Sequence, residues 1–423
     1  MKVVIVGGGS TYTPELIDGF ARLRATLPVE ELWLVDPDPV RLELVSGISR
    51  RMFARAGHTG RIMTSSSVAE GVTDADVVLL QLRIGGQEAR HGDETFPHEV
   101  HCIGQETTGP GGFAKALRTV PVVLEIAEII RQRAKPNAWI IDFTNPVGIV
   151  TRALLQEGHR AVGLCNVAIG FQRKFAALMD VGHQDISLDH VGLNHLTWET
   201  GVNLRQDGAT RDILPELLKN RLDELAADVR MPAGLLELQG AVPSYYLRYF
   251  YSHDVVLGEQ LVKPSRAAEV TKIENSLLAK YADTSLDTKP AELAERGGAF
   301  YSEAAIDLMA SLTSNRGDVQ VVNVRNDGTL PFLPDDHVIE VPAAITSEKL
   351  IVQPVKALPT EMAALIGHVA GYERLALDAA IHGGRDRVLK AMLAHPLVGQ
   401  YEKAEKLTDT LLAANRNHLE WAK

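Results

Sequence analysis

Two side chains able to bind a transition metal follow apolar segments in the middle of the chain. Cys165 stands in VGLCNVAIG, and His195 stands in VGLNHLTW at the expected end of another strand. A thiolate and an imidazole from two strand ends can hold a divalent ion and leave coordination positions open for a substrate. On spacing alone, however, a buried core side chain is the more common role of a free cysteine.

A second cluster, His98-x-x-His101-Cys102, has more ligand-like spacing and precedes GQETTGPGG in an expected loop. The chain has only two cysteines, Cys102 and Cys165, and a large chain with so few is not held together by disulfides. We therefore expect both cysteines to be reduced thiols, and the sequence offers two candidate metal sites.

A glycine-rich turn follows the first apolar run and opens a helical segment. It consists of Gly7, Gly8, Gly9, Ser10 and Thr11, and Tyr12 replaces the last glycine of G-x-G-x-x-G. Glycine lets backbone amides approach a pyrophosphate, and a helix N-terminus adds partial positive charge. Asp36 after the second apolar run can accept hydrogen bonds from ribose hydroxyls and repel a 2′-phosphate, which favours NAD over NADP. The alternatives are a plain tight turn and a strand-ending DPDP turn.

The elements that must position these residues alternate in type over the first 165 residues. Helical patterns separate the apolar runs KVVIV, ELWLVD, RIMTS, ADVVLLQL, AWIIDF and RAVGLC. This alternation predicts an α/β fold with a six-stranded, Rossmann-type, doubly wound parallel sheet, whose ligands bind at the carboxyl ends of the strands. Later helical segments, interrupted by ISLDHVGL and GDVQVVNVRN, predict a mixed α+β part. We expect an NAD-binding domain over residues 1–166 and a C-terminal catalytic and substrate-binding domain over 167–423.

Composition excludes several classes of protein. Of the 423 residues, 45% are hydrophobic and 23% are charged, which is typical of a globular chain rather than a disordered one. A formal net charge of −11 argues against a nucleic-acid partner, since such binding depends on clustered Lys and Arg. The apolar run of MKVVIV is too short for a signal peptide, and no run reaches the length of a membrane span. We expect a cytoplasmic protein without membrane contact.

The segment IDFTNPVG resembles the TNPV segment of the lactate and malate dehydrogenase superfamily, in which the asparagine reaches substrate and nicotinamide. Here that asparagine is Asn145. The resemblance implies a dehydrogenase-like fold and leaves a 2-hydroxy acid dehydrogenase as an alternative function. Against this alternative, we find no arginine in the N-terminal half combined with an aspartate and a histidine in the C-terminal half that resembles the catalytic set of that family.

Further collinear segments resemble glycoside hydrolase family 4, the NAD- and metal-dependent glycosidases. They are VGGGSTYTPEL, RIGGQEAR, GQETTGPGGFAKALRTVPV, DFTNPVGIVT, GLCNVAIG, VGLNHL, PSYYLRYFY and RGGAFYSEAA. The resemblance places the metal ligands on Cys165 and His195 and the catalytic tyrosine on Tyr246 rather than Tyr245. It associates Glu106 with the basicity of that tyrosine. The substrate-contacting positions that it implies are Arg90, Asn145 and Arg266.

The residue after the metal cysteine differs between subgroups of this family. Enzymes acting on 6-phospho-β-glucosides resemble C-N-x-P, 6-phospho-α-glucosidases have C-D, and α-galactosidases have C-H. Asn166 therefore favours a 6-phospho-β-glucosidase and is included among the catalytic residues, although Ala168 replaces the usual proline. We expect a phosphorylated disaccharide or aryl glucoside as substrate. The candidates to bind its phosphate are Arg83, Arg90, Arg266 and Arg296, with a surface ion pair as the equal alternative for Arg83 and Arg296.

Family 4 enzymes are an exception to glycoside hydrolysis by two carboxylates. The resemblance implies transient oxidation of the sugar C3 by NAD, removal of the C2 proton by Tyr246, elimination of the aglycone and addition of water. A divalent ion, Mn²⁺ by family resemblance, would stabilise the developing charge. Without the resemblance, an aromatic core segment is the favoured interpretation of PSYYLRYFY, and a non-catalytic NAD-sensing protein is a further alternative function. Family resemblance also implies a homo-oligomer.

Overall fold

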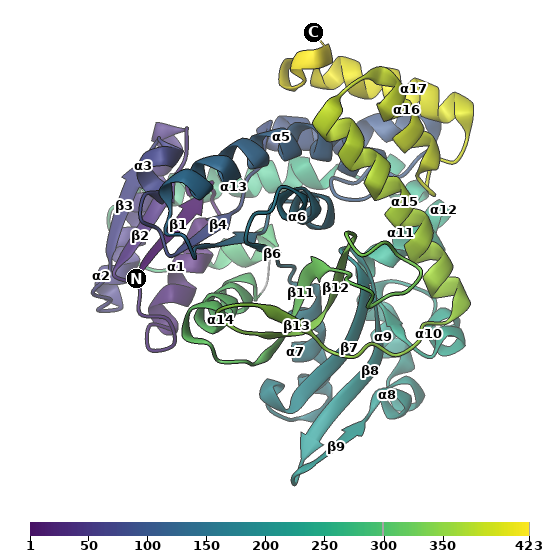
Figure 1. Cartoon of the computed structure of the whole chain (residues 1–423), viewed down its shortest axis with the longest axis horizontal. Coiled ribbons are helices and arrows are strands. Elements are labelled where there is room, and N and C mark those ends of the chain that lie inside the picture. Colours follow the sequence, from purple (N-terminus) through teal and green to yellow (C-terminus); the bar gives the residue numbers. More distant parts are fainter. Residues whose placement is uncertain (298–299, 423) are drawn as a thin grey trace.

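The computed structural model of the protein describes residues 1–297 and 300–422 (Figure 1). Gly298 and Ala299 of the segment RGGAFYSEAA lie outside the described residues. Strands and helices alternate in the first part of the chain. They are β1 (Lys2–Val6), α1 (Thr13–Arg22), β2 (Glu31–Val35), α2 (Pro39–Arg55), β3 (Arg61–Ser65), α3 (Val68–Val72), β4 (Val77–Leu80), α4 (Gly86–Thr95), η1 (Phe96–Val100), α5 (Gly109–Arg133), β5 (Trp139–Asp142), α6 (Val147–Gln156) and β6 (Ala161–Gly163).

These strands form the predicted parallel sheet. They pair in the order β3-β2-β1-β4-β5-β6, which is the doubly wound order of dinucleotide-binding folds. Apart from Lys2 and Asp142 at two strand ends, β1, β4 and β5 are continuous apolar runs because helices cover both faces of a parallel sheet, and Val3, Val4 and Ile5 are completely buried. The predicted Rossmann-type fold is confirmed.

Local sequence explains where the helices begin. Asp38 caps α2 because its side chain accepts hydrogen bonds from the backbone N–H groups of Val40 and Arg41, and Pro39 occupies the first helical position. The long helix α5 begins at Gly109 and ends at Arg133. Its first turn therefore lies directly beside the GQET segment.

The second part of the chain mixes helices and strands, as predicted. The strands are β7 (Ile186–Leu193), β8 (Leu196–Gln206), β9 (Ala209–Asp212), β10 (Val242–Pro243), β11 (Val319–Arg325), β12 (Val338–Ile345) and β13 (Leu350–Val352). The helices are α7 (Val167–Met179), η2 (His183–Asp185), α8 (Leu214–Asn220), α9 (Leu222–Val229), α10 (Ala233–Gln239), η3 (Tyr245–Leu247), α11 (Arg248–Tyr251), α12 (His253–Val262), α13 (Arg266–Ala282), η4 (Ala291–Arg296), α14 (Tyr301–Ser314), α15 (Thr360–His382), α16 (Arg385–Ala394), α17 (Tyr401–Asn415), η5 (Arg416–His418) and η6 (Glu420–Ala422).

The sheet continues across both parts of the chain. Within the described residues it has 13 strands, because β11 pairs antiparallel with β6, followed by β12, β7, β8 and β10. The register places Asn323 opposite Gly163 and Glu340 opposite both Asn323 and Gly192. Side chains from β6, β7, β11 and β12 are thus brought together in the middle of the molecule. The expected division of the chain at residue 166 stays a prediction.

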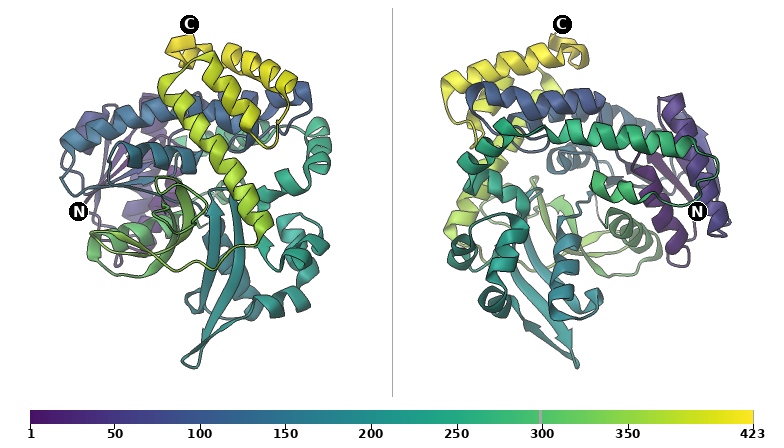
Figure 2. Two further views of the ribbon diagram at one scale, coloured as in Figure 1. Left: turned by 45° about the vertical axis from the view of Figure 1, so that its right-hand side comes forward. Right: turned by 180° about the vertical axis from the view of Figure 1, so that it is seen from behind.

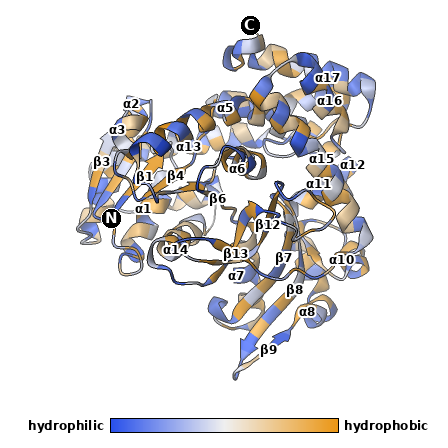
Figure 3. Ribbon diagram, in the orientation of Figure 1, coloured by the Kyte–Doolittle hydropathy of each residue, from blue (hydrophilic) through white to orange (hydrophobic). Residues whose placement is uncertain are grey.

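Helices cover this sheet. Figure 2 shows the C-terminal helices on the side of the molecule opposite the projecting strand β9; α15 and α17 contact α5, and α16 packs against α15 and α17. Figure 3 shows hydrophobic residues concentrated along the strands, where the core of the protein lies. None of the helices in the described ranges is both long enough and apolar enough to cross a membrane.

Candidate active site

Cys165 and His195 follow two strands, β6 and β7, that are separated in the sheet by β11 and β12. Cys165 follows β6 and precedes α7, and His195 lies in the two-residue turn between β7 and β8 with a φ of 62°. Both side chains are buried, with exposed fractions of 5% and 6%. The backbone N–H groups of Val167 and Asn166 at the start of α7 and the side chain of Asn194 act to lower the pKa of Cys165 and so favour its thiolate. Burial nevertheless raises the pKa of the Cys165 thiol, with a contribution from the negative charge of Glu340.

Two neighbours orient the His195 ring. Its Nδ1 lies 2.9 Å from the hydroxyl oxygen of Thr107, and its face stacks on Tyr246 with a centroid separation of 3.7 Å and an interplanar angle of 7°. Burial lowers the pKa of His195 to about 4, so the ring is neutral, as a metal ligand must be. Since Thr107 occupies Nδ1, Nε2 is the nitrogen left for a metal ion.

Tyr246 lies in η3, directly after β10 and the buried Ser244. Burial raises its pKa well above the ordinary value, and the charges of Cys165, Tyr249 and Glu106 act in the same direction. Its neighbour Tyr245 instead accepts a hydrogen bond of 2.8 Å from Nη1 of Arg248. The structure therefore places Tyr246, and not Tyr245, against His195, as the motif resemblance implies.

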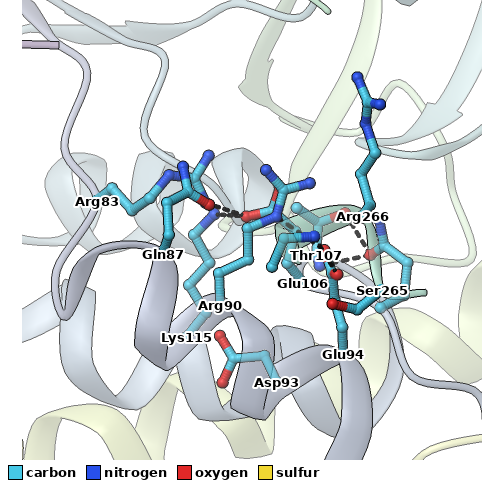
Figure 4. A network of polar contacts seen from close by, with 12 residues as sticks. Arg83, Gln87, Arg90, Asp93, Glu94, Glu106, Thr107, Lys115, Ser265 and Arg266 are labelled. Atoms are coloured by element: carbon cyan, nitrogen blue, oxygen red, sulfur yellow. Dashed lines mark hydrogen bonds and ion pairs between the residues drawn. The ribbon is translucent and has the colours of Figure 1, made fainter. Parts of the chain in front are cut away.

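Glu106 lies in a cluster of charged side chains, of which Glu106 itself and Lys115 are buried (Figure 4). Its carboxylate pairs with Arg83, with Arg90 at 3.0 Å and with Lys115 at 2.6 Å. Although burial opposes ionisation of Glu106, these three cations hold its pKa well below the usual range. Burial also lowers the pKa of Lys115 to about 8. The ion-pair partners of Glu106 are these cations and do not include Tyr246. The expected effect of Glu106 on the basicity of Tyr246 therefore stays a prediction.

The remaining arginine candidates lie apart from Glu106. Arg266 begins α13, is largely exposed, and pairs with Glu269 at 3.0 Å, and Figure 4 shows it extending away from the other labelled side chains. Arg296 ends η4, pairs with Glu274 at 2.9 Å, and lies over the Tyr12 ring. Arg296 thus lies beside the glycine turn, and its expected role in phosphate binding stays a prediction.

The glycine turn fits a dinucleotide. A Cβ added at Gly7 would lie 2.6 Å from the Gln81 carbonyl oxygen, and one at Gly8 would lie 2.8 Å from the Leu34 Cα, so neither position has room for a side chain. Gly9 N donates a 2.9 Å hydrogen bond to Oδ2 of Asp36, whose pKa is raised by burial. The Asp36 carboxylate thus lies directly beside the turn, where a ribose would be bound.

Two other residues of the nucleotide turn contact the polypeptide itself. The hydroxyl group of Thr11 donates to Glu274 at 3.2 Å, and that of Ser10 accepts from the Tyr12 N–H group at 3.2 Å. α1 begins at Thr13, so several residues separate the glycines from the helix. The first-turn amides remain close to the glycine turn.

Asn166 lines a cavity beside Tyr246, and Asn145 directly precedes Pro146, which lines a second cavity beside His195. Within the described residues, the buried Asn145 Oδ1 has no hydrogen-bond partner, as expected of an atom that awaits a ligand. A cavity of about 550 Å³ is lined by Asn166, Val167, Gly170, Phe171, Arg173, Lys174, Asp228, Val229, Tyr245, Tyr246 and Phe300. A smaller cavity of about 30 Å³ is lined by residues that include Thr107, Pro146, Asn194 and His195.

The second candidate metal cluster does not converge. Cys102 is completely buried and its sulfur contacts the Leu397 carbonyl oxygen at 3.6 Å, whereas His98 contacts Gln260 and His101 is exposed. Over residues 1–297 and 300–422, no three His, Cys, Asp or Glu side chains lie close enough to form a metal site. The pair Cys165 and His195 therefore remains the better candidate, with its other coordination positions left for non-protein ligands.

Several residues around this site were not predicted from the sequence. Thr107 directly follows Glu106 in GQETTGPGG, and Asn194 directly precedes His195 in VGLNHL. This adjacency would have been enough to predict both as residues of the site. Lys115 follows the same glycines and is now a partner of Glu106. Glu340 lies in an ordinary strand pattern, and nothing in the sequence marks it as close to Cys165.

Comparisons with known proteins agree with this arrangement. Residues 2–181 match the family model "Family 4 glycosyl hydrolase", and residues 190–398 match "Family 4 glycosyl hydrolase C-terminal domain". The chain is 36% identical to the "Probable 6-phospho-beta-glucosidase" of Bacillus subtilis (strain 168), over 99% of this chain and 97% of the relative.

Solved structures show the same likeness. The 6-phospho-beta glucosidase from Thermotoga maritima, solved with manganese, NAD+ and glucose-6-phosphate, has a TM-score of 0.92 and 33% identity, with 99% of each chain covered. Malate dehydrogenase from Plasmodium falciparum, with a TM-score of 0.52 and 13% identity over 90% of this chain and 98% of that chain, shares the fold alone, which confirms the predicted dehydrogenase-like architecture. The matched segments together span most of the polypeptide, and the chain belongs to family 4 of the glycosyl hydrolases.

Proposed function

We propose that this protein is a 6-phospho-β-glucosidase that depends on NAD and a divalent metal ion, with Mn²⁺ as the preferred ion. The observation that carries the proposal is the convergence of Cys165, His195 and Tyr246 at one buried site. It is supported by relatives of this name that align over almost the entire chain. The substrate is a phosphorylated disaccharide or an aryl glucoside.

The metal ion would be held by the Cys165 sulfur and by His195 Nε2. Thr107 fixes the tautomer and orientation of His195 through Nδ1, as second-sphere partners of metal-binding histidines do. When bound, the ion supplies Lewis-acid polarisation of a sugar oxygen, and NAD supplies a reversible oxidant for the sugar. Both donor atoms are buried, so bulk water is kept from the site.

Tyr246 is the proposed base that removes the proton from C2 of the sugar. Its ring is fixed by stacking on His195, so the hydroxyl has a defined position. The surroundings of Tyr246 disfavour its phenolate, and positive charge beside the ring is required for Tyr246 to act as a base near neutral pH. We propose that Glu106 and its ion-pair partner Lys115 influence the basicity of Tyr246 through their charges.

The rest of the site binds the two small molecules. The glycine turn and Asp36 hold the NAD pyrophosphate and ribose, with Ser10 and Thr11 at the edge of the turn. Asn145 Oδ1, buried without a partner among the described residues, would receive a hydrogen bond from the sugar or the nicotinamide. The arginines proposed for the sugar phosphate are Arg83, Arg90, Arg266 and Arg296. Asn166 lines the cavity of about 550 Å³, which would receive the aglycone.

Several alternatives remain testable. A 6-phospho-α-glucosidase or an α-galactosidase would use the same fold and cofactors but a different substrate, and Asn166 after Cys165 favours the β-glucoside. A 2-hydroxy acid dehydrogenase would accumulate NADH in proportion to product. We further propose a cytoplasmic homo-oligomer, with an NAD-binding domain over residues 1–166 and a substrate-binding domain over 167–423.

The decisive experiment mixes purified protein, NAD and Mn²⁺ with α- and β-linked 6-phosphoglucosides, their galacto epimers and the unphosphorylated sugars. We expect aglycone release only from 6-phospho-β-glucosides, without net NADH. In D₂O the released sugar should carry deuterium at C2. Unlabelled product would contradict proton removal by Tyr246, and stoichiometric NADH would support the dehydrogenase alternative.

A further inference from the structure

The turn that contains His195 is hydrogen-bonded to a buried network of charged and polar side chains. His190 of β7 lies between two carboxylates, with Nδ1 2.6 Å from Glu199 of β8 and Nε2 3.0 Å from Glu340 of β12. All three residues are at most 1% exposed. Removing charged groups from water to this extent is costly, so their presence here needs an explanation.

Of these three buried residues, Glu340 is the one closest to the candidate metal site. Its Oε2 accepts hydrogen bonds from Nδ2 of Asn194 at 2.7 Å and from Nδ2 of Asn323 at 2.9 Å. Together with His190, three donors therefore converge on this carboxylate. A carboxylate surrounded by donors is ionised, because the ionised form is acceptor-only. Glu340 is thus a fixed negative charge.

Asn194 links Glu340 to the metal ligands. Its side chain also favours the thiolate form of Cys165, and one hydrogen of its amide NH₂ is donated to Glu340. Asn194 directly precedes His195 in the turn between β7 and β8. One side chain therefore connects a buried carboxylate to one metal ligand while its backbone carries the other.

Charge explains why a carboxylate belongs at this position. Cys165 and His195 together supply one negative charge as thiolate and neutral imidazole, whereas the ion that they would hold carries two positive charges. Glu340 lies close enough that its charge acts on both Cys165 and His195. It could compensate the ion electrostatically without using a coordination position that the substrate needs.

We propose that Glu340, acting through Asn194, is a positioning residue of the metal site: it orients Cys165 and supplies the second negative charge that a divalent ion requires. This inference rests on the proposed metal binding by Cys165 and His195. Glu199 serves a different purpose, because it bonds the opposite nitrogen of His190 and is the counter-charge that keeps this ring protonated.

The test measures Mn²⁺ affinity directly, from the EPR signal of free Mn²⁺ during titration of metal-free protein in the presence of NAD. Glu340→Gln should weaken Mn²⁺ binding by about 10- to 100-fold, the range found for partners of metal ligands. Asn194→Ala, which leaves the charge but cuts the link, should weaken binding as well. Co²⁺ in place of Mn²⁺ should show a weaker sulfur-to-metal charge-transfer band in both variants.

Glu199→Gln is the matched control, since it removes a carboxylate of the same kind from the same histidine at the same depth. Its Mn²⁺ affinity should stay within about threefold of the unmodified protein, although its melting temperature falls. Equal weakening by Glu199→Gln and Glu340→Gln would show a purely structural network and overturn the inference. Wild-type affinity in Asn194→Ala would also overturn it, and this variant decides the question if Glu340→Gln does not fold.

The outcome also separates this inference from the function on which it rests. If the unmodified protein binds no Mn²⁺, both the proposed metal site and the role of Glu340 are wrong. If it binds Mn²⁺ and Glu340→Gln binds it equally well, only the role of Glu340 is wrong. NAD binding, measured by calorimetry, should be unchanged in all three variants, because the hydrogen bonds of the glycine turn within residues 1–297 and 300–422 go to other residues, among them Asp36 and Gln81.

Discussion

Adjacent tyrosines allow the proposed base to be tested with a closely matched control. Tyr246→Phe removes the hydroxyl that would take the C2 proton but keeps the ring that stacks 3.7 Å from His195. Tyr245→Phe removes a hydroxyl one position earlier in the same short helix. The two changes are chemically identical, so any difference in activity must come from position.

The expected magnitudes differ in kind. A general base contributes about 10²- to 10⁴-fold in rate, so Tyr246→Phe should lower kcat by this factor, which corresponds to about 3–5 kcal/mol. Over the described residues its hydroxyl has no recorded hydrogen bond, so the free energy of unfolding should change by less than about 1 kcal/mol. Tyr245→Phe loses the 2.8 Å hydrogen bond from Arg248 and should destabilise the fold by about 1.5 kcal/mol while kcat changes only a few-fold.

The assay follows aglycone release from an aryl 6-phospho-β-glucoside with NAD and Mn²⁺, alongside thermal melting of each variant. Mn²⁺ and NAD affinity should be preserved in Tyr246→Phe, since the ring and the metal ligands are unchanged. Turnover by Tyr246→Phe within tenfold of the unmodified protein would refute the assignment of the base. An equal loss in Tyr245→Phe would show that the effect is structural.

Three further expectations follow from the same geometry. Gly9→Ala places a Cβ 2.7 Å from Asp36 Cγ and should weaken NAD binding at least tenfold by calorimetry, whereas unchanged affinity would place the cofactor elsewhere. Cys165→Ala should abolish both Mn²⁺ binding and activity but leave NAD binding intact, and full activity with NAD alone would contradict the metal site. Burial raises the pKa of Asp142 to about 8, so the protonated carboxyl stabilises the fold fully below the unfolded pKa of about 4, and this contribution is lost as pH rises through about 8. The melting temperature of Asp142→Asn should therefore exceed that of the unmodified protein by an amount that grows between about pH 5 and 8.5. A difference in melting temperature that does not change with pH would show that Asp142 is ionised throughout this range.

The sequence was sufficient for the elements that local pattern determines. The central residues of runs such as KVVIV and AWIIDF are apolar because parallel strands are buried on both faces, and the helices between them could be recognised by their periodicity. Cys165, His195 and Tyr246 were predicted from short motifs, and the structure places them together.

The remaining features depend on pairings between distant segments, which no local pattern encodes. The hydrogen bond that joins β11 to β6 brings Asn323 beside Gly163, and the next pairing brings Glu340 within reach of Asn194. The three cations around Glu106 come from separate elements, so their convergence could not be read from spacing. His195 was expected at a strand end and lies in the following turn, because the β7–β8 connection has only two residues.

The antiparallel pairing of β11 with β6 has a consequence for how the polypeptide can be divided. A fragment ending at residue 166 would leave the outer side of β6 without its partner, and an unpaired strand edge of this kind promotes aggregation. The cofactor half and the half that carries His195 should therefore mature as one cooperative unit, and neither is suited to independent expression. The proposed binding positions of sugar, nicotinamide and metal ion are then fixed relative to one another when the protein folds. No hinge movement between separate lobes is needed to align them.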